Sequence, residues 1–178
     1  MDILCLCYGL AGHSHSERPA PTHWTALRGH RLLRTLPRKE VERLAWAGHW
    51  LRFPPERVVV RQGTPVEAVL FVVQGKAVAV MERPWPGSQD FEATVHFLDP
   101  GADIGLLSLV DGAPHPATVT TLTSLEVVAI PSGVLQESLR RHPSRYRALA
   151  RAAVEDLRAY QRAWQPQRER HQGQQILC

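Results

Sequence analysis

The chain has 178 residues and a formal net charge of +4, with 44% hydrophobic and 21% charged residues. This composition excludes wholesale disorder, collagen-like repeats and coiled-coil rods, and the length suits one domain with tails. The positive charge is concentrated at one end, where nine Arg stand against three acidic residues from Arg140 onwards. The rest of the chain is slightly acidic, so the net charge does not by itself indicate a nucleic-acid binder.

The N-terminal residues 1–23 end in a Ser-, His- and Pro-rich stretch without periodicity, which predicts a flexible arm. Cysteines occur only near the chain ends, which is not the pattern of a disulfide framework and favours a reducing cytoplasm. They are Cys5, Cys7 and Cys178. Cys5 and Cys7 with His13 and His15 have metal-ligating side chains, but their spacing does not match a zinc finger, so we expect no metal. No export signal or membrane-spanning run is recognised.

The middle of the chain begins with a helical pattern over residues 36–45, whose expected buried stripe contains Leu36, Leu44 and Trp46. Short runs rich in β-branched residues follow, separated by Gly and Pro turns. They span residues 51–53, 58–61, 68–73, 77–81, 91–98, 117–122 and 125–130. A short helix is expected over residues 134–141, with Ser132 as its N-cap. This order predicts one α+β domain over residues 24–143, an antiparallel sandwich or barrel with helices at one side.

A longer helical pattern covers residues 144–165, and the tail 166–178 is expected to be flexible. Apolar residues recur along this helix at alternating steps of four and three, which is the spacing of a narrow packing seam. They are Tyr146, Ala150, Ala153, Leu157, Tyr160 and Trp164. The seam suits packing against the parent domain or against a second copy, and its narrowness favours a homodimer.

Three blocks in the middle of the chain resemble a known family. Residues 60–80 contain a Gln-Gly turn before a buried strand, residues 98–109 read LDPGADIGLLSL, and residues 111–119 read DGAPHPATV. In this order and spacing they resemble cyclic-nucleotide-binding domains, and most of all the sensor domains of the bacterial catabolite-activator (CRP/FNR) regulators. The resemblance covers roughly residues 30–165. It implies a β-roll or jelly-roll barrel flanked by N-terminal helices and followed by a long C-terminal dimerisation helix.

The last two blocks correspond to the family's phosphate-binding cassette, residues 105–118 here. In the family, a short helix directs backbone N–H groups at the cyclic phosphate, an Arg pairs with that phosphate, and a Glu binds the ribose hydroxyl. The residues of this chain at the cassette positions are Gly105, Leu106, Leu107, Ser108, His115, Pro116, Ala117 and Thr118. Leu106 stands in place of the Glu and His115 in place of the Arg, so we expect at least about hundredfold weaker nucleotide binding. The leucines at 106, 107 and 109 either line an apolar cavity or fill it.

The family's transcription factors carry a helix-turn-helix domain after the long helix, whereas fourteen residues follow Trp164 here. We therefore expect no sequence-specific DNA binding. No motif of a hydrolase, nucleoside triphosphatase or zinc protease is present, which argues against an enzyme. The expected function is a cytoplasmic bacterial regulatory or adaptor module that acts by protein contact, with no required cofactor. The alternatives are a true sensor of a cyclic nucleotide or other small ligand with altered specificity, and a nucleic-acid-associated protein.

Overall fold

A computed structural model describes residues 21–30, 33–84, 91–144, 147 and 151. Three helical elements come first: α2 (Pro21–Gly29), the short 3-10 helix η1 (Leu33–Thr35) and α3 (Arg38–Ala47). A succession of strands follows, with α4 (Leu106–Asp111) inserted between two of them and α5 (Ser132–Arg141) after the last. No helix within these described ranges is long and apolar enough to cross a membrane.

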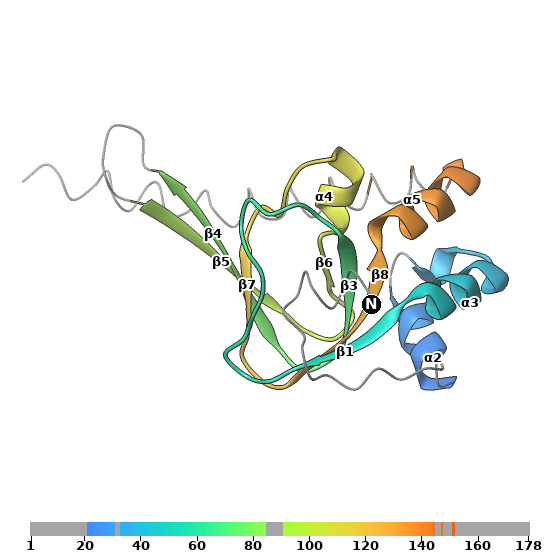
Figure 1. The fold of residues 1–178 in the computed structure, drawn as a ribbon, viewed down its shortest axis with the longest axis horizontal. Helices are drawn as coiled ribbons and strands as arrows, with labels where there is room; N and C mark the ends of the chain where they lie inside the picture. Colours follow the sequence, from blue (N-terminus) through green and yellow to red (C-terminus); the bar gives the residue numbers. More distant parts are fainter. Residues whose placement is uncertain (1–20, 31–32, 85–90, 145–146, 148–150, 152–178) are drawn as a thin grey trace, which may run out of the picture.

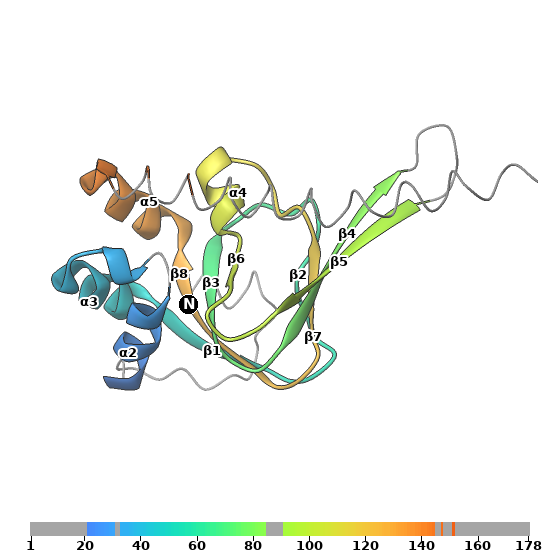
Figure 2. The same ribbon diagram turned by 180° about the vertical axis from the view of Figure 1, so that it is seen from behind.

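The described strands form two antiparallel four-stranded sheets. The first sheet has the order β1-β8-β3-β6, and the second has the order β2-β7-β4-β5. Their bounds are β1 His49–Phe53, β2 Val58–Val60, β3 Ala68–Gln74, β4 Ala77–Pro84, β5 Phe91–Leu98, β6 Asp103–Ile104, β7 Thr118–Thr121 and β8 Leu125–Pro131. The helices α2, α3 and α5 gather at one side of the roll, and the β4–β5 ribbon projects from the opposite side (Figures 1 and 2). The predicted antiparallel roll with helices at one side is confirmed.

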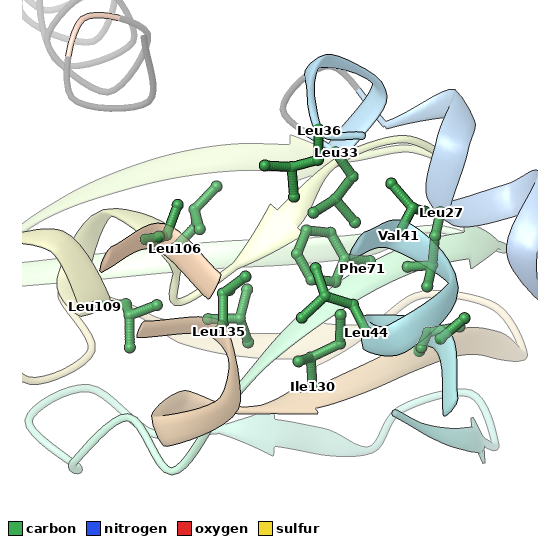
Figure 3. Close-up of a cluster of buried hydrophobic side chains, with 14 residues drawn as sticks. Leu27, Leu33, Leu36, Val41, Leu44, Phe71, Leu106, Leu109, Ile130 and Leu135 are labelled. Atoms are coloured by element: carbon green, nitrogen blue, oxygen red, sulfur yellow. The ribbon is translucent and has the colours of Figure 1, made fainter. Parts of the chain in front are cut away.

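Two groups of buried side chains hold these layers together. The roll core lies inside the strands and includes Phe53, Leu70 and Val127. The helical core lies between the first sheet and the helices, where Leu44 of α3 and Leu135 of α5 meet Phe71 of β3 (Figure 3). Residues of β3 alternate between the two cores because successive strand side chains point to opposite faces. β3 is therefore buried on both faces, as its nearly uninterrupted apolar run requires.

Polar contacts fix how α3 meets α5 within the helical layer. Arg43 donates hydrogen bonds to Glu40 Oε1 at 2.6 and 3.0 Å, and His142, just after α5, lies 3.9 Å from Glu40 Oε2. The hydrogen bond from Arg43 lowers the pKa of the Glu40 carboxyl although its burial acts in the opposite direction. Glu40 is therefore held as a carboxylate between the two helices.

Several sequence expectations about the helices are wrong. Trp46 is 67% exposed rather than buried. It lies two residues, about 200° of rotation, from the buried Leu44, so the two side chains lie on opposite faces of α3. Ser132 does not cap α5; its hydroxyl donates to the carbonyl of Val66, and the helix starts at Ser132 itself. α2 begins at Pro21, inside the range expected to be a flexible arm, since proline suits a first helical turn.

Other expectations fall outside the described residues. Of the expected dimerisation helix over residues 144–165, the structure describes only Ser144, Arg147 and Arg151. The seam residues from Tyr146 to Trp164 lie outside the described residues. The N-terminal residues Cys5, Cys7, His13 and His15 and the tail 166–178 are outside as well.

Candidate phosphate-binding cassette

The cassette begins at a glycine whose conformation the other amino acids rarely adopt. Gly105 has φ 92° and directly precedes α4, between the two-residue strand β6 and the helix. A Cβ atom added there would lie 2.9 Å from Cε1 of His115 and 3.1 Å from Cγ1 of Val66. The backbone of Gly105 is therefore packed directly against the imidazole ring. This close approach requires glycine for two independent reasons, its φ angle and the lack of space.

The helix α4 turns its apolar side chains toward the helical core. Leu106 is 6% exposed and Leu109 7% exposed, and both belong to the cluster that contains Leu135 and Ile130 (Figure 3). Leu107 is half-buried. Of the two expectations for these leucines, the structure assigns Leu106 and Leu109 to the packing between α4 and the helices. The position that carries an acid in the family is thus an apolar anchor in this chain.

A second set of contacts closes the loop between α4 and β7. The hydroxyl of Ser108, which is buried, donates to the carbonyl of Pro114 at 3.1 Å. The amide of Ala113 donates to Oδ1 of Asp111 at 2.9 Å, and Gly112 ends the helix in a left-handed conformation. Ser108 therefore acts on the shape of the loop.

His115 is buried and held by its backbone. Its N–H donates to the carbonyl of Thr64 at 2.9 Å, and its carbonyl accepts from the N–H of Gly63 at 2.8 Å. The residue is only 3% exposed, and no described residue hydrogen-bonds to the nitrogens of its imidazole ring. Burial lowers the pKa of the imidazole. His115 is therefore neutral at pH 7, and an Arg-like positive charge is missing at this position.

The remaining cassette residues connect the loop to the second sheet. Pro116 is exposed and has no N–H to donate, while Ala117 and Thr118 are half-buried. Oγ1 of Thr118 accepts from the N–H of Gln62 at 3.1 Å. The Gln62 side chain in turn makes two hydrogen bonds with the backbone of Glu82 on β4, at 2.8 and 2.9 Å. The Gln-Gly turn noted in the sequence thus connects the cassette loop to β4 through hydrogen bonds of Gln62.

A histidine and a carboxylate link the helical layer to the strand that precedes the cassette. Nε2 of His30, at the end of α2, lies 3.3 Å from Oδ2 of Asp103 on β6. The His30 ring also packs edge-on against Phe71, with ring centroids 4.8 Å apart. Sequence reasoning missed this contact because its two residues are more than seventy positions apart and belong to no motif. Within the described ranges, no group of three or more His, Cys, Asp or Glu is arranged to hold a metal ion.

Comparisons with known proteins agree with this geometry. The family model described as "Cyclic nucleotide-binding domain" matches residues 50–142, more than half of the chain. A curated relative, the cAMP-dependent protein kinase regulatory subunit of Dictyostelium discoideum, is 30% identical over 122 residues. That match covers 65% of this chain and 37% of the relative, so the chain spans little more than a third of that protein.

Solved structures show the same fold. The regulatory domain of Toxoplasma gondii PKA, crystallised with cAMP, superposes with a TM-score of 0.62 at 24% identity, covering 75% of this chain and 49% of that one. The N-terminal domain of a transcriptional regulator from Streptomyces coelicolor superposes with a TM-score of 0.56 at 28% identity, covering 78% and 94%. Together with the family model and the cassette geometry, these similarities place the chain in the cyclic nucleotide-binding domain family.

Proposed function

We propose that the chain is a non-enzymatic regulatory or adaptor module whose phosphate-binding cassette has lost the groups that hold a cyclic nucleotide. This proposal rests on the surroundings of the two residues that stand in place of the family's Glu and Arg. Leu106 is packed into the helical core, and His115 is a buried neutral imidazole against the backbone of Gly105. Neither side chain supplies the charge that a ribose hydroxyl or a cyclic phosphate requires.

The proposed output is contact with another protein. A relative in this family is named as the regulatory subunit of a protein kinase, which supports a regulatory role. Dimerisation through the seam from Tyr146 to Trp164, a cytoplasmic bacterial setting and descent from the catabolite-activator branch are parts of the same proposal. Replacing Leu157 by Asp in the seam should lower the molecular mass measured in solution by light scattering. An unchanged mass would remove the helix-mediated dimer from the proposal.

Calorimetric titration of the full chain with cAMP, cGMP and c-di-GMP tests the lost cassette. We expect no saturable binding below about 100 μM, since losing both charged contacts weakens binding at least about hundredfold. A micromolar dissociation constant for any of the three nucleotides would overturn the proposal.

A second candidate is a sensor of a different small ligand. It is favoured by the intact scaffold, because Gly105, α4 and the Ser108–Pro114 hydrogen bond keep the cassette in shape. Mass spectrometry of small molecules that co-purify with the native protein checks this alternative. A bound compound whose retention is lost on His115→Ala would favour the sensor over the adaptor.

A further inference from the structure

A groove of about 600 Å³ lies beside β2 and is separate from the apolar packing of α4. It is lined by the six consecutive residues 56–61, by Thr64, Pro65 and Glu67, and by His115. The pairing of β2 with β7 shifts in register between Val58 and Val60, so side chains do not alternate regularly along β2. None of the β7 residues that pair with β2 lines this groove. The groove therefore follows the edge of β2 opposite β7.

That edge is open in the described part of the chain. β2 is the terminal strand of the second sheet, and β7 is its partner there. A terminal strand presents backbone N–H and C=O groups to which another extended segment can pair. Addition of a peptide strand to such an edge is a common mode of protein recognition. The groove has the volume range of ligand sites in proteins.

The walls of the groove carry charges without partners. Arg57 and Arg61 are exposed, stand four positions apart, and form no ion pair with a described residue. Glu56 and Glu67 lie in the same lining and are likewise unpaired among the described residues. Between the two arginines, Val59 and Val60 are 5% and 6% exposed and supply an apolar floor. The lining therefore carries two cations and two anions, and the two arginines flank the apolar floor.

One end of the groove is held in shape before any partner binds. Glu56 has φ 60°, an uncommon left-handed conformation for a residue other than glycine. The buried Thr121 fixes this turn: its carbonyl accepts from the N–H of Glu56 at 2.9 Å, and its hydroxyl accepts from the N–H of Arg57 at 2.8 Å. The same hydroxyl donates to the carbonyl of Pro54 at 2.7 Å. A wall ordered in advance lowers the entropy lost on binding.

His115 also lines the groove. The residue is 3% exposed, and no described residue hydrogen-bonds to its ring nitrogens. These nitrogens are nevertheless not among the fully buried atoms without a partner in the described residues, which are Nε1 of Trp24 and Oγ of Ser138. His115 therefore marks where the groove meets the cassette loop.

We propose that the groove beside β2 docks an extended peptide segment of a partner protein by strand addition, with acidic side chains of the peptide facing Arg57 and Arg61. Arg57 and Arg61 lie four positions apart on either side of the buried valines, so the test peptide carries two acids four positions apart with an apolar residue midway. This inference rests on the proposed function, in which the chain acts by contact with another protein, and it names the surface of that contact. His115 belongs to both the cassette and this groove, but nucleotide titration tests the cassette, whereas peptide titration of Arg61→Glu tests β2, so the two proposals fail separately.

The test is an NMR titration of the full chain with the capped heptapeptide Ser-Glu-Thr-Val-Thr-Glu-Ser. We expect amide shifts confined to residues 56–67 and 115, slower hydrogen exchange in β2, and a dissociation constant of about 1 mM or tighter. A peptide with proline in place of the central valine, which cannot donate to a ladder, should bind at least tenfold more weakly. So should a peptide with lysine in place of both glutamates.

Matched variants complete the test. Arg61→Glu should weaken binding about tenfold or more, whereas Arg83→Glu, an exposed arginine on β4, should leave it unchanged. The proposal is overturned if shifts are absent from residues 56–61. It is overturned as well if the proline peptide or the lysine peptide binds the chain as tightly as the original peptide does, or if Arg61→Glu binds the original peptide as tightly as the unmodified chain does. It is also overturned if nuclear Overhauser contacts in the free protein join β2 to residues 1–20, because the chain's own segment would then occupy the groove.

Discussion

The two sides of the cassette are built by different forces. On the α4 side, Leu106 and Leu109 are packed among the aliphatic side chains of the helical core. On the loop side, His115 is held by two backbone hydrogen bonds to Gly63 and Thr64 while its ring has no described partner. The first side stabilises the fold through apolar burial, and the second presents polar groups toward a cavity.

Under the proposed function, this difference explains how the family fold is kept without the family's ligand contacts. Apolar packing of α4 needs only residues of suitable size and hydrophobicity, and leucine at position 106 satisfies that need. Binding a cyclic phosphate needs a particular charge at a particular place. The fold can therefore be maintained while the residues at the charged positions change. Each prediction below perturbs one side and leaves the other as its control.

The largest effect is expected from Leu106→Glu, which restores the acid of the family at a position now 6% exposed. We expect a loss of about 3–5 kcal/mol in the free energy of unfolding, because a carboxyl group enters an apolar cluster. Urea denaturation measures it. Leu107→Glu, at the half-buried neighbouring position, is the control and should cost about 1 kcal/mol. Equal losses for the two variants would contradict the assignment of Leu106 to the helical core.

The second-largest effect is expected at Gly105, where the α4 side and the loop side of the cassette meet. Gly105→Ala should destabilise the fold by about 2–3 kcal/mol, since it combines a left-handed φ with the approach of His115. Gly101→Ala has nearly the same φ but open space around it, and should cost about 1 kcal/mol. In a His115→Ala background the penalty at Gly105 should fall toward the Gly101 value. A penalty independent of His115 would show that the ring does not pack on this glycine.

The loop side alone is tested by Gln62→Ala. This change removes two hydrogen bonds between the Gln62 side chain and the β4 backbone at an exposed position, so we expect a loss of about 1 kcal/mol. Hydrogen exchange should speed up at residues 62–64 and 115–118 and stay unchanged in α4. Faster exchange throughout α4 would mean that the two sides are not independently held.

The smallest effect concerns protonation of His115. Burial lowers its folded-state pKa below the ordinary value near 6.5, so the unfolded chain takes up the proton first as the pH falls. Its contribution to stability is therefore complete above pH 6.5 and declines below it, by less than about 1 kcal/mol per pH unit. Melting temperatures of the chain and of His115→Asn between pH 5 and 8 measure this decline. A difference between the two that does not change with pH would contradict it.

The fold was largely predictable from sequence because its signals are local. Gly and Pro turns separate short β-branched runs, so most strand bounds were predicted to within a few residues. The errors arise where a tertiary contact decides the outcome. Trp46 fits an apolar pattern but falls on the outer face of α3, and Ser132 binds the carbonyl of Val66 instead of capping a helix.

The candidate site divides in the same way. The cassette positions were predicted from the motif, whereas the burial of Leu106 and the contact between His115 and Gly105 depend on how distant segments pack. The groove beside β2 was missed altogether. Its residues 56–61 look like an ordinary strand and turn, and only the order of strands in the sheet reveals an unpaired edge.

The central claim is that the cassette keeps its scaffold and lacks the charge that holds a cyclic phosphate. Parallel calorimetric titration of the chain and of His115→Arg with cAMP tests this claim most directly. We predict no saturable binding to the chain below about 100 μM and at least tenfold tighter binding to the variant, because a guanidinium restores a charge-assisted phosphate contact. Micromolar binding of cAMP to the unmodified chain would contradict it.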